Sequence, residues 1–286
     1  MTQPQFDPAA YKATQRAQWN QDAAAWQRWT PTLEHWAAPV TQQMLALAAV
    51  TAGDHVLDIA TGAGEPALSA AQLVGNAGHV LATDLSAAMV QFTQENATAK
   101  GLSNLTARVM DGEQLELPDH SVDVVLCRFG LIYMPNAGQA LAEWWRVLKP
   151  GGRLAVAVFT TPDKNQWGSI PAGIILQHAQ LPPPQPGRPG PFSLGGEGVL
   201  AAALANAGFE QVSTTAFSMP LRMTSAKECV TFERESFGAF NQMMFHLSPK
   251  ERAAAWDAVE VAMRQFEGPD GFAVSCEPLI GVAKKG

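Results

Sequence analysis

The sequence predicts a single α/β domain built on a doubly wound sheet. From residue 53 onward, short apolar runs alternate with helical stretches, the pattern of parallel strands joined by crossover helices. The first apolar run is followed by a glycine turn, TGAGE at 61–65, and the second ends in Asp84. In open α/β sheets such residues meet at the carboxyl ends of the strands, where ligands bind. We therefore expect a Rossmann-like sheet with its site at that edge.

The expected elements follow in chain order. Residues 1–50 form a helical cap rich in alanine and tryptophan, and 51–160 form a core with strands at 55–60, 80–84, 106–110, 122–127 and 154–159. LKPGG at 148–152 is expected to be a type II turn. Prolines and glycines are so dense over 160–196 that we expect an irregular lid rather than a long helix. A helix at 197–207, a strand near 209–219, a helical insertion at 225–266 and a final strand at 272–283 complete the single domain, 1–286.

Composition excludes several classes of protein. The chain has 286 residues, a formal charge of −7 and no basic run, so the electrostatic footprint of a nucleic-acid binder is missing. The cysteines Cys127, Cys229 and Cys276 are far apart and odd in number, which argues against disulfides and a zinc site. Neither a leader-like N-terminus nor a long apolar run occurs. We expect a cytoplasmic protein without a membrane span, as monomer or homodimer.

The glycine turn admits two cofactors. GAGEPA at 62–67 matches a dinucleotide fingerprint, with Asp84 about 20 residues on, so an NAD(P)-dependent oxidoreductase is one candidate. Two features argue against it. Asp58 lies inside the first strand, with Ala60 and Thr61 before the glycines, and the third strand is followed by a second acidic turn, DGE at 111–113.

The ordered set of motifs resembles the class I S-adenosylmethionine-dependent methyltransferases, and within them the ubiquinone and menaquinone biosynthesis branch. The resemblance rests on VLDIATGAG at 56–64, ATDLSAAM at 82–89, VMDGEQLELPDHSVDVV at 109–125, FGLIYMP at 129–135 and RVLKPGGRLAVAVF at 146–159. It covers about residues 50–160. It implies a sheet of seven strands with the last antiparallel, S-adenosylmethionine as cofactor, and a small-molecule methyl acceptor.

The resemblance also implies roles for individual residues. Gly62 and Gly64, with Ala60 and Thr61, would surround the methionyl group, Asp84 would bind the ribose, and Leu85 and Met89 would lie beside the adenine. Asp111 or Glu113 would meet the adenine amino group, with Gly112 contributing backbone contacts. Asp58 would either organise its own loop or meet the methionyl ammonium. Cys127, Arg128 and Phe129 would form the floor under the sulfonium and the methionyl part. For Cys127 a small buried residue is the favoured interpretation, because a free cysteine usually behaves as a hydrophobic side chain.

The acceptor and the mechanism are less determined. The quinone enzymes continue FGL with Arg-Asn, whereas Ile132 and Tyr133 follow here, so a quinone acceptor does not follow from the resemblance. Candidates for a general base are His35, Tyr133, His178 and His246, and no metal-ligand spacing occurs. We expect a mostly apolar acceptor (aromatic, quinol or polyketide-like), with a non-methylating enzyme that binds S-adenosylmethionine, for example a cyclase, as the alternative. The expected acceptor pocket contains Trp29, Tyr133 and Trp167. Its expected roof consists of the N-terminal segment with Trp19, Trp26, Trp29 and Trp36, the Pro-rich stretch, and the insertion with Phe237, Phe240, Met243, Met244 and Phe245.

Overall fold

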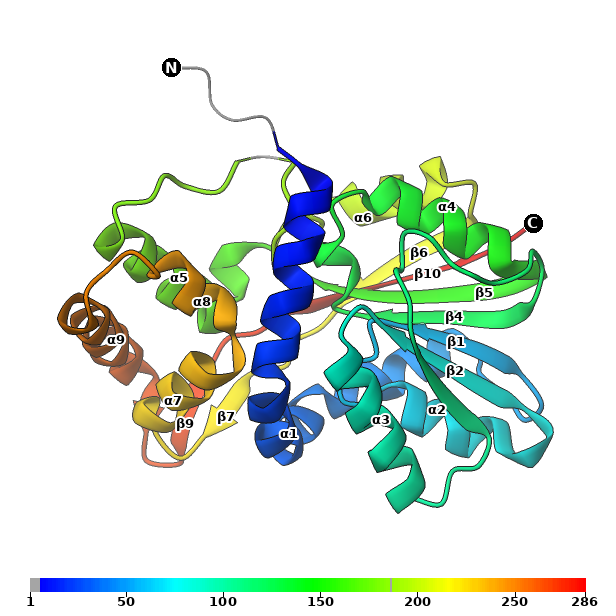
Figure 1. The fold of residues 1–286 in the computed structure, drawn as a ribbon, viewed down its shortest axis with the longest axis horizontal. Coiled ribbons are helices and arrows are strands. Elements are labelled where there is room, and N and C mark those ends of the chain that lie inside the picture. Colours follow the sequence, from blue (N-terminus) through cyan, green and yellow to red (C-terminus); the bar gives the residue numbers. More distant parts are fainter. Residues whose placement is uncertain (1–5, 186) are drawn as a thin grey trace.

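A seven-stranded sheet forms the centre of the molecule in the computed structural model, which describes residues 6–185 and 187–286 (Figure 1). Its strand order is β3-β2-β1-β4-β5-β10-β6, and β10 runs antiparallel to both of its neighbours. The predicted sheet, with its last strand antiparallel, is confirmed. Its strands are β1 (His55–Ile59), β2 (His79–Asp84), β3 (Leu105–Val109), β4 (Val122–Arg128), β5 (Leu148–Phe159), β6 (Glu210–Ala216) and β10 (Pro278–Lys284).

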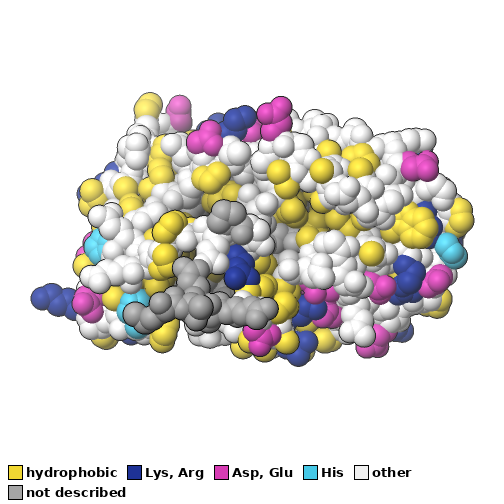
Figure 2. Space-filling view, turned by 90° about the horizontal axis from the view of Figure 1, so that it is seen from above, with side chains coloured by type: hydrophobic (Ala, Val, Ile, Leu, Met, Phe, Trp, Pro, Cys, Tyr) yellow, Lys and Arg dark blue, Asp and Glu magenta, His cyan; other side chains and the backbone are white. Residues whose placement is uncertain are grey.

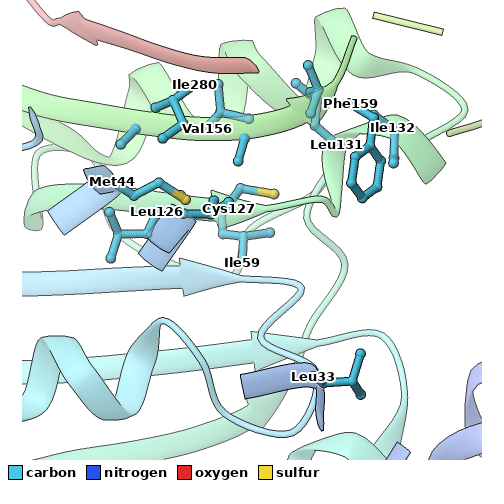
Figure 3. Packing of buried hydrophobic residues seen from close by; sticks show 14 of the residues in the cluster. Leu33, Met44, Ile59, Leu126, Cys127, Leu131, Ile132, Val156, Phe159 and Ile280 are labelled. Atoms are coloured by element: carbon cyan, nitrogen blue, oxygen red, sulfur yellow. The ribbon is translucent and has the colours of Figure 1, made fainter. Parts of the chain in front are cut away.

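Helices cover both faces of this sheet because its central strands are apolar on both sides. In β1 every position after the first is buried, and in β4 every position except Asp123 and Arg128 is buried. Crossover helices connect the parallel strands: α2 (Ala67–Val74), α3 (Ala87–Ala99), α4 (Ala137–Val147) and α6 (Val199–Asn206). Figure 3 shows Ile59, Leu126 and Val156 from adjacent strands packing with Met44 of the first helix.

The predicted N-terminal cap is one long helix, α1 (Pro8–Leu47), of 40 residues. Asp7 caps its N-terminus, because its side chain accepts hydrogen bonds from the N–H groups of Ala9 and Ala10. Proline occupies the first helical position. In Figure 1 it passes in front of the sheet edge, between the sheet and a second group of helices. The helix therefore belongs to both parts of the molecule, the sheet and the second group of helices. Residues 1–5 of the predicted cap lie outside the described residues.

The second group of elements forms the cap beside α1. It consists of α5 (Gln166–His178), α7 (Ala226–Ser236), α8 (Gly238–Met243), α9 (Pro249–Met263) and a small sheet of β7 (Leu221–Met223), β8 (Glu267–Gly268) and β9 (Gly271–Val274). The predicted insertion at 225–266 is helical, as expected. Helix α5 packs on α9, and α7 packs on α1 and α9.

Two expectations about this region are wrong. The stretch at 160–196 is not irregular throughout, because α5 forms in its first half. That half holds only Pro162 and Pro171, and α5 buries Trp167, Pro171 and Ile175 on one face, which offsets the bond lost at Pro171. The predicted final strand at 272–283 is two strands in different sheets. Pro278 lacks an N–H and begins the second of them, a position that proline tolerates. Pro186 lies outside the described residues.

The LKPGG stretch is counted within β5 but interrupts its pairing. The register with β4 shifts between Val122 and Val124, which pair with Leu148 and Arg153, and Gly151 has a φ of +76°. Gly151 thus has the positive φ that the third residue of the expected type II turn requires, within a stretch that belongs to the strand. None of the described helices is long and apolar enough to cross a membrane. On the face drawn in Figure 2, acidic and basic side chains are mixed rather than gathered into a basic patch.

Candidate cofactor and acceptor site

A large pocket opens at the carboxyl ends of β1 to β4, where the motif residues converge. It holds about 1460 Å³ of empty space, part of it open to solvent. The residues selected from the sequence that line it include Ala60, Thr61, Gly62, Asp84, Leu85, Met89, Asp111, Gly112, Arg128, Phe129, Tyr133, Trp167 and Phe237.

The turn after β1 is held by the carboxylate after β2. Asp84 accepts bonds from the Gly62 N–H at 3.0 Å and from the Ser86 N–H at 2.8 Å. Gly62 has a φ of +59°, and a Cβ placed on it would meet no atom within 4 Å. Its missing side chain thus leaves space in the pocket. Gly64 has another reason to be glycine, since a Cβ there would lie 2.7 Å from Leu68.

Asp58 and Cys127 lie behind the pocket wall instead of lining it. The Asp58 carboxylate is fully buried and accepts a bond from the Ala67 N–H at the start of α2, at 3.2 Å. Burial raises the pKa of Asp58 to about 7, while the Thr61 hydroxyl and Arg128 oppose that rise. Burial likewise raises the pKa of the Cys127 thiol to about 12, and Figure 3 shows this side chain within the core. Both positions match the structural alternatives that the sequence left open.

The acidic turn after β3 is paired with a lysine of α1. The ammonium of Lys12 lies 2.6 Å from Oδ2 of Asp111 and 2.6 Å from Oε2 of Glu113. Glu113 also accepts the Asn136 N–H at 2.7 Å, is buried, and does not line the pocket. Asp111 and Lys12 do line it. Of the two acids proposed for the adenine, the structure thus brings only Asp111 to the pocket.

The other half of the pocket is lined by aromatic rings in mutual contact, which we call the aromatic belt. Neighbouring ring centroids lie 4.1 Å apart for Phe129 and Phe159, and 5.3 Å apart for Trp19 and Trp26. The indole N–H groups of Trp26 and Trp36 are bonded to backbone carbonyls, so these rings present apolar faces. The belt comprises Trp19, Trp26, Trp36, Phe129, Tyr133, Phe159, Trp167 and Phe237.

Several predicted site residues lie elsewhere. Trp29 packs on Phe232, 5.3 Å between centroids, and donates its indole N–H to Glu235. His35, His178 and His246 are exposed and outside the pocket lining. Of the five apolar residues selected from the insertion, only Phe237 lines the pocket. The other four lie outside its lining: Phe240, Met243, Met244 and Phe245.

The tryptophans of the N-terminal segment were expected as a roof of the pocket, but Trp29 was selected among them, whereas Trp19 and Trp26 line it. A signal for these two exists in the sequence. Residues 19, 26 and 33 are spaced by seven, which places them on one face of a helix, and all three line the pocket. Trp29 falls outside this spacing. Lys12, Glu34 and Glu65 were also missed. Lys12 falls on the same spacing of seven as residues 19, 26 and 33, whereas no periodicity marks Glu34 on α1 or Glu65 in the glycine turn.

Comparison with known proteins finds similarity in the middle of the chain. Residues 56–152 match the family model described as a methyltransferase domain. The ubiquinone/menaquinone biosynthesis C-methyltransferase UbiE of Pseudoalteromonas translucida is 37% identical over 123 residues, which are 43% of this chain and 49% of that protein. The chain thus spans about half the length of the curated relatives that it matches.

Solved structures share the fold across most of the chain. A putative methyltransferase from Bacillus halodurans superposes with a TM-score of 0.56 at 19% identity, covering 86% of this chain and 98% of that one. The [4+2]-cyclase SpnF superposes with a TM-score of 0.57 at 20% identity, covering 93% and 95%. The predicted resemblance to the class I S-adenosylmethionine-dependent methyltransferases, and within them to the quinone biosynthesis branch, is confirmed by these matches. Residues 56–152 are the part of the chain that matches a methyltransferase domain.

Proposed function

We propose that the protein transfers the methyl group of S-adenosylmethionine to a small, mostly apolar acceptor held in the aromatic belt. The observation that supports this most is the continuity of one pocket from the turn after β1 to the rings of α1, α5 and Phe237. A cofactor at the strand ends would have its sulfonium facing the belt. The acceptor classes that suit such walls are aromatic, quinol-like and polyketide-like molecules, because strongly polar groups would lose their hydrogen bonds there.

The residues of the first half fit the cofactor. Gly62 leaves the space that a methionyl chain needs, and Asp84 places a carboxylate at the end of β2, where a ribose diol can donate to it. Leu85 and Met89 supply apolar contacts for a purine beside Asp111. When bound, the cofactor supplies an already activated electrophile.

The chain's own contribution would be to orient the acceptor and exclude water. Orientation of this kind can account for several kcal/mol of a barrier. No histidine occurs in the pocket lining within the described part of the chain. Tyr133 carries the one titratable group of the aromatic belt, and burial raises the pKa of its hydroxyl. A neutral phenol can donate a hydrogen bond to the acceptor, so we propose that Tyr133 orients it and does not remove its proton.

The test is formation of S-adenosylhomocysteine with a panel of acceptors. The panel contains quinols, since a relative is named a ubiquinone/menaquinone C-methyltransferase, together with planar phenols, N-heterocycles, glycine and small acids. We expect turnover with members of the first three classes. Methylation of glycine or acids alone would overturn the acceptor proposal. Conversion of an acceptor without S-adenosylhomocysteine would instead indicate a non-methylating enzyme, and SpnF shows that a cyclase can have this fold.

A matched pair of variants tests the aromatic belt. Trp26 lines the pocket, whereas Trp29 lies on the same helix outside it. We expect Trp26→Leu to lower kcat/KM for the acceptor at least tenfold while binding of S-adenosylhomocysteine stays within threefold, a tenfold change being about 1.4 kcal/mol. Trp29→Leu should leave both unchanged. Equal effects of the two variants would show that the aromatic belt is not part of the acceptor site.

A further inference from the structure

Two loops at one end of the cap carry exposed apolar side chains that the proposed site does not use. One loop, residues 179–185, follows α5, and the other, residues 244–248, joins α8 to α9. Phe245 is 70% exposed, the highest value among the large apolar side chains of the described residues, and Leu181 is 38% exposed. His246 connects the loops, because its ring contacts Phe245 and its Nε2 lies 3.1 Å from a carbonyl oxygen of the first loop. We call these two loops the loop tip.

The backbone at the apolar positions of the loop tip has few N–H groups that depend on water. The N–H groups of Leu181, Phe245 and Leu247 each donate to a carbonyl oxygen of their own loop or of the helix before it, at 3.0–3.2 Å. The three prolines at 182–184 have no N–H. An unbonded N–H loses its water when it enters an apolar medium, which costs free energy. The loop tip avoids most of that cost.

Positive charge adjoins the apolar side chains. Lys250 and Arg252, near the start of α9, are exposed and form no ion pair among the described residues. Glu251 is the one acid in the first turn of α9, and its carboxylate caps the helix by accepting the N–H of the preceding loop residue at 2.8 Å. His178 and His246 add side chains that become positive when protonated. Because the whole chain carries a formal charge of −7, an anionic surface can be attracted only by such a local excess of cations.

Two helices connect the loop tip with the acceptor end of the pocket. Trp167 lies in the first turn of α5, which ends at the first loop, and Phe237 directly precedes α8, which ends at the second loop. Both of these aromatic residues line the pocket. The two helices contact each other and lie together on one side of α1 (Figure 1). The loop tip is therefore the far end of the helices that begin at the aromatic belt.

We propose that the loop tip docks on an anionic lipid bilayer, with Phe245 and Leu181 inserted at the level of the headgroups and Lys250 and Arg252 beside the lipid phosphates. Apolar side chains next to cations are the composition with which peripheral proteins bind such surfaces. A second copy of the chain on the same surface would instead bring like charges together. A bilayer also holds the apolar molecules that suit the aromatic belt, so it would be the source of the acceptor. This last part rests on the proposed function.

Co-sedimentation with vesicles, without cofactor or acceptor, tests the docking. Wild type should bind vesicles of equal parts phosphatidylcholine and phosphatidylglycerol several times more tightly than vesicles of phosphatidylcholine alone. Phe245→Ser should lower the partition coefficient about tenfold or more, because one large apolar side chain no longer leaves water. Lys250→Gln and Arg252→Gln should each lower it about fivefold on the anionic vesicles, and high salt should remove that difference. Val261→Ser is the matched control, because Val261 is 66% exposed but lies about three turns further along α9.

Three results would overturn the proposal. They are no binding of wild type to either kind of vesicle, an equal loss of binding in Phe245→Ser and Val261→Ser, and a loss of dimer mass in Phe245→Ser by analytical ultracentrifugation without vesicle binding. The third result would assign the loop tip to an interface between copies of this chain. Circular dichroism verifies the folding of each variant, and Leu181→Ser replaces Phe245→Ser if that variant does not fold. The acceptor panel is measured without vesicles, so its failure and a failure of docking are separate results.

Discussion

Replacing Lys12 with methionine should loosen the N-terminal half of α1 over the cofactor end of the pocket. Its ammonium bridges Asp111 and Glu113 at 2.6 Å each, with side-chain exposures of 24%, 28% and 7%. Fully exposed ion pairs contribute about 0–1 kcal/mol to the free energy of unfolding, and hydrogen bonds to charged groups contribute about 1.5–3 kcal/mol. For this intermediate burial we expect a loss of about 1–2 kcal/mol in the free energy of unfolding. That corresponds to about 2–8 °C in Tm for a chain of this size.

Thermal unfolding at low and high salt, together with hydrogen exchange over residues 8–20, measures this effect. The Tm difference should shrink at 1 M salt, where the Debye length is about 3 Å. Exchange should become faster in the first turns of α1 and stay unchanged near Thr41. Lys250→Met is the control, because Lys250 is exposed and forms no ion pair among the described residues. Equal Tm values for Lys12→Met and wild type at low salt, with unchanged exchange, would refute the reasoning.

Three further predictions concern the cofactor end. Asp84→Ala should weaken the binding of S-adenosylhomocysteine about tenfold to a thousandfold in calorimetry, since the carboxylate would accept two hydrogen bonds from the ribose of roughly 1.5–3 kcal/mol each. Unchanged affinity would overturn the ribose assignment. Gly62→Val should abolish cofactor binding, because the valine side chain would enter the pocket. The positive φ at this position should also cost roughly 1–2 kcal/mol of stability, visible in thermal melts. Full cofactor binding by the folded variant would contradict the close approach of the backbone.

The last of the three is a pH dependence of Asp58. Because burial raises its pKa from 3.8 to about 7, its contribution to stability is fully present below pH 3.8 and is lost as the pH rises through 7. The free energy of unfolding of wild type relative to Asp58→Asn should therefore fall between pH 4 and 7, by up to about 1.4 kcal/mol per pH unit. Denaturant titrations across that range check it, and a flat or rising difference would show that Asp58 is not titrating as a buried acid.

The sequence by itself determined the sheet and the cofactor end of the pocket. The same segments predict both the strands and the ligand-binding residues, since each motif directly follows an apolar run. The topology of a parallel sheet then brings the ends of these strands together. Gly62, Asp84 and Asp111 could thus be selected as neighbours although 22 residues separate the first two. The helical insertion at 225–266 was also predicted.

Only the tertiary structure decided the acceptor end and the charged pairs. Trp26 faces the pocket and Trp29 faces Glu235 because of how α1 is rotated about its axis, which depends on what packs against it over 200 residues away. Lys12 with Asp111, and Arg128 with Thr41, are 99 and 87 residues apart, and no local pattern encodes such pairs. The split of the predicted last strand into β9 and β10 has the same origin. A short apolar run carries the propensity to be a strand, and its partner in space decides which sheet it joins.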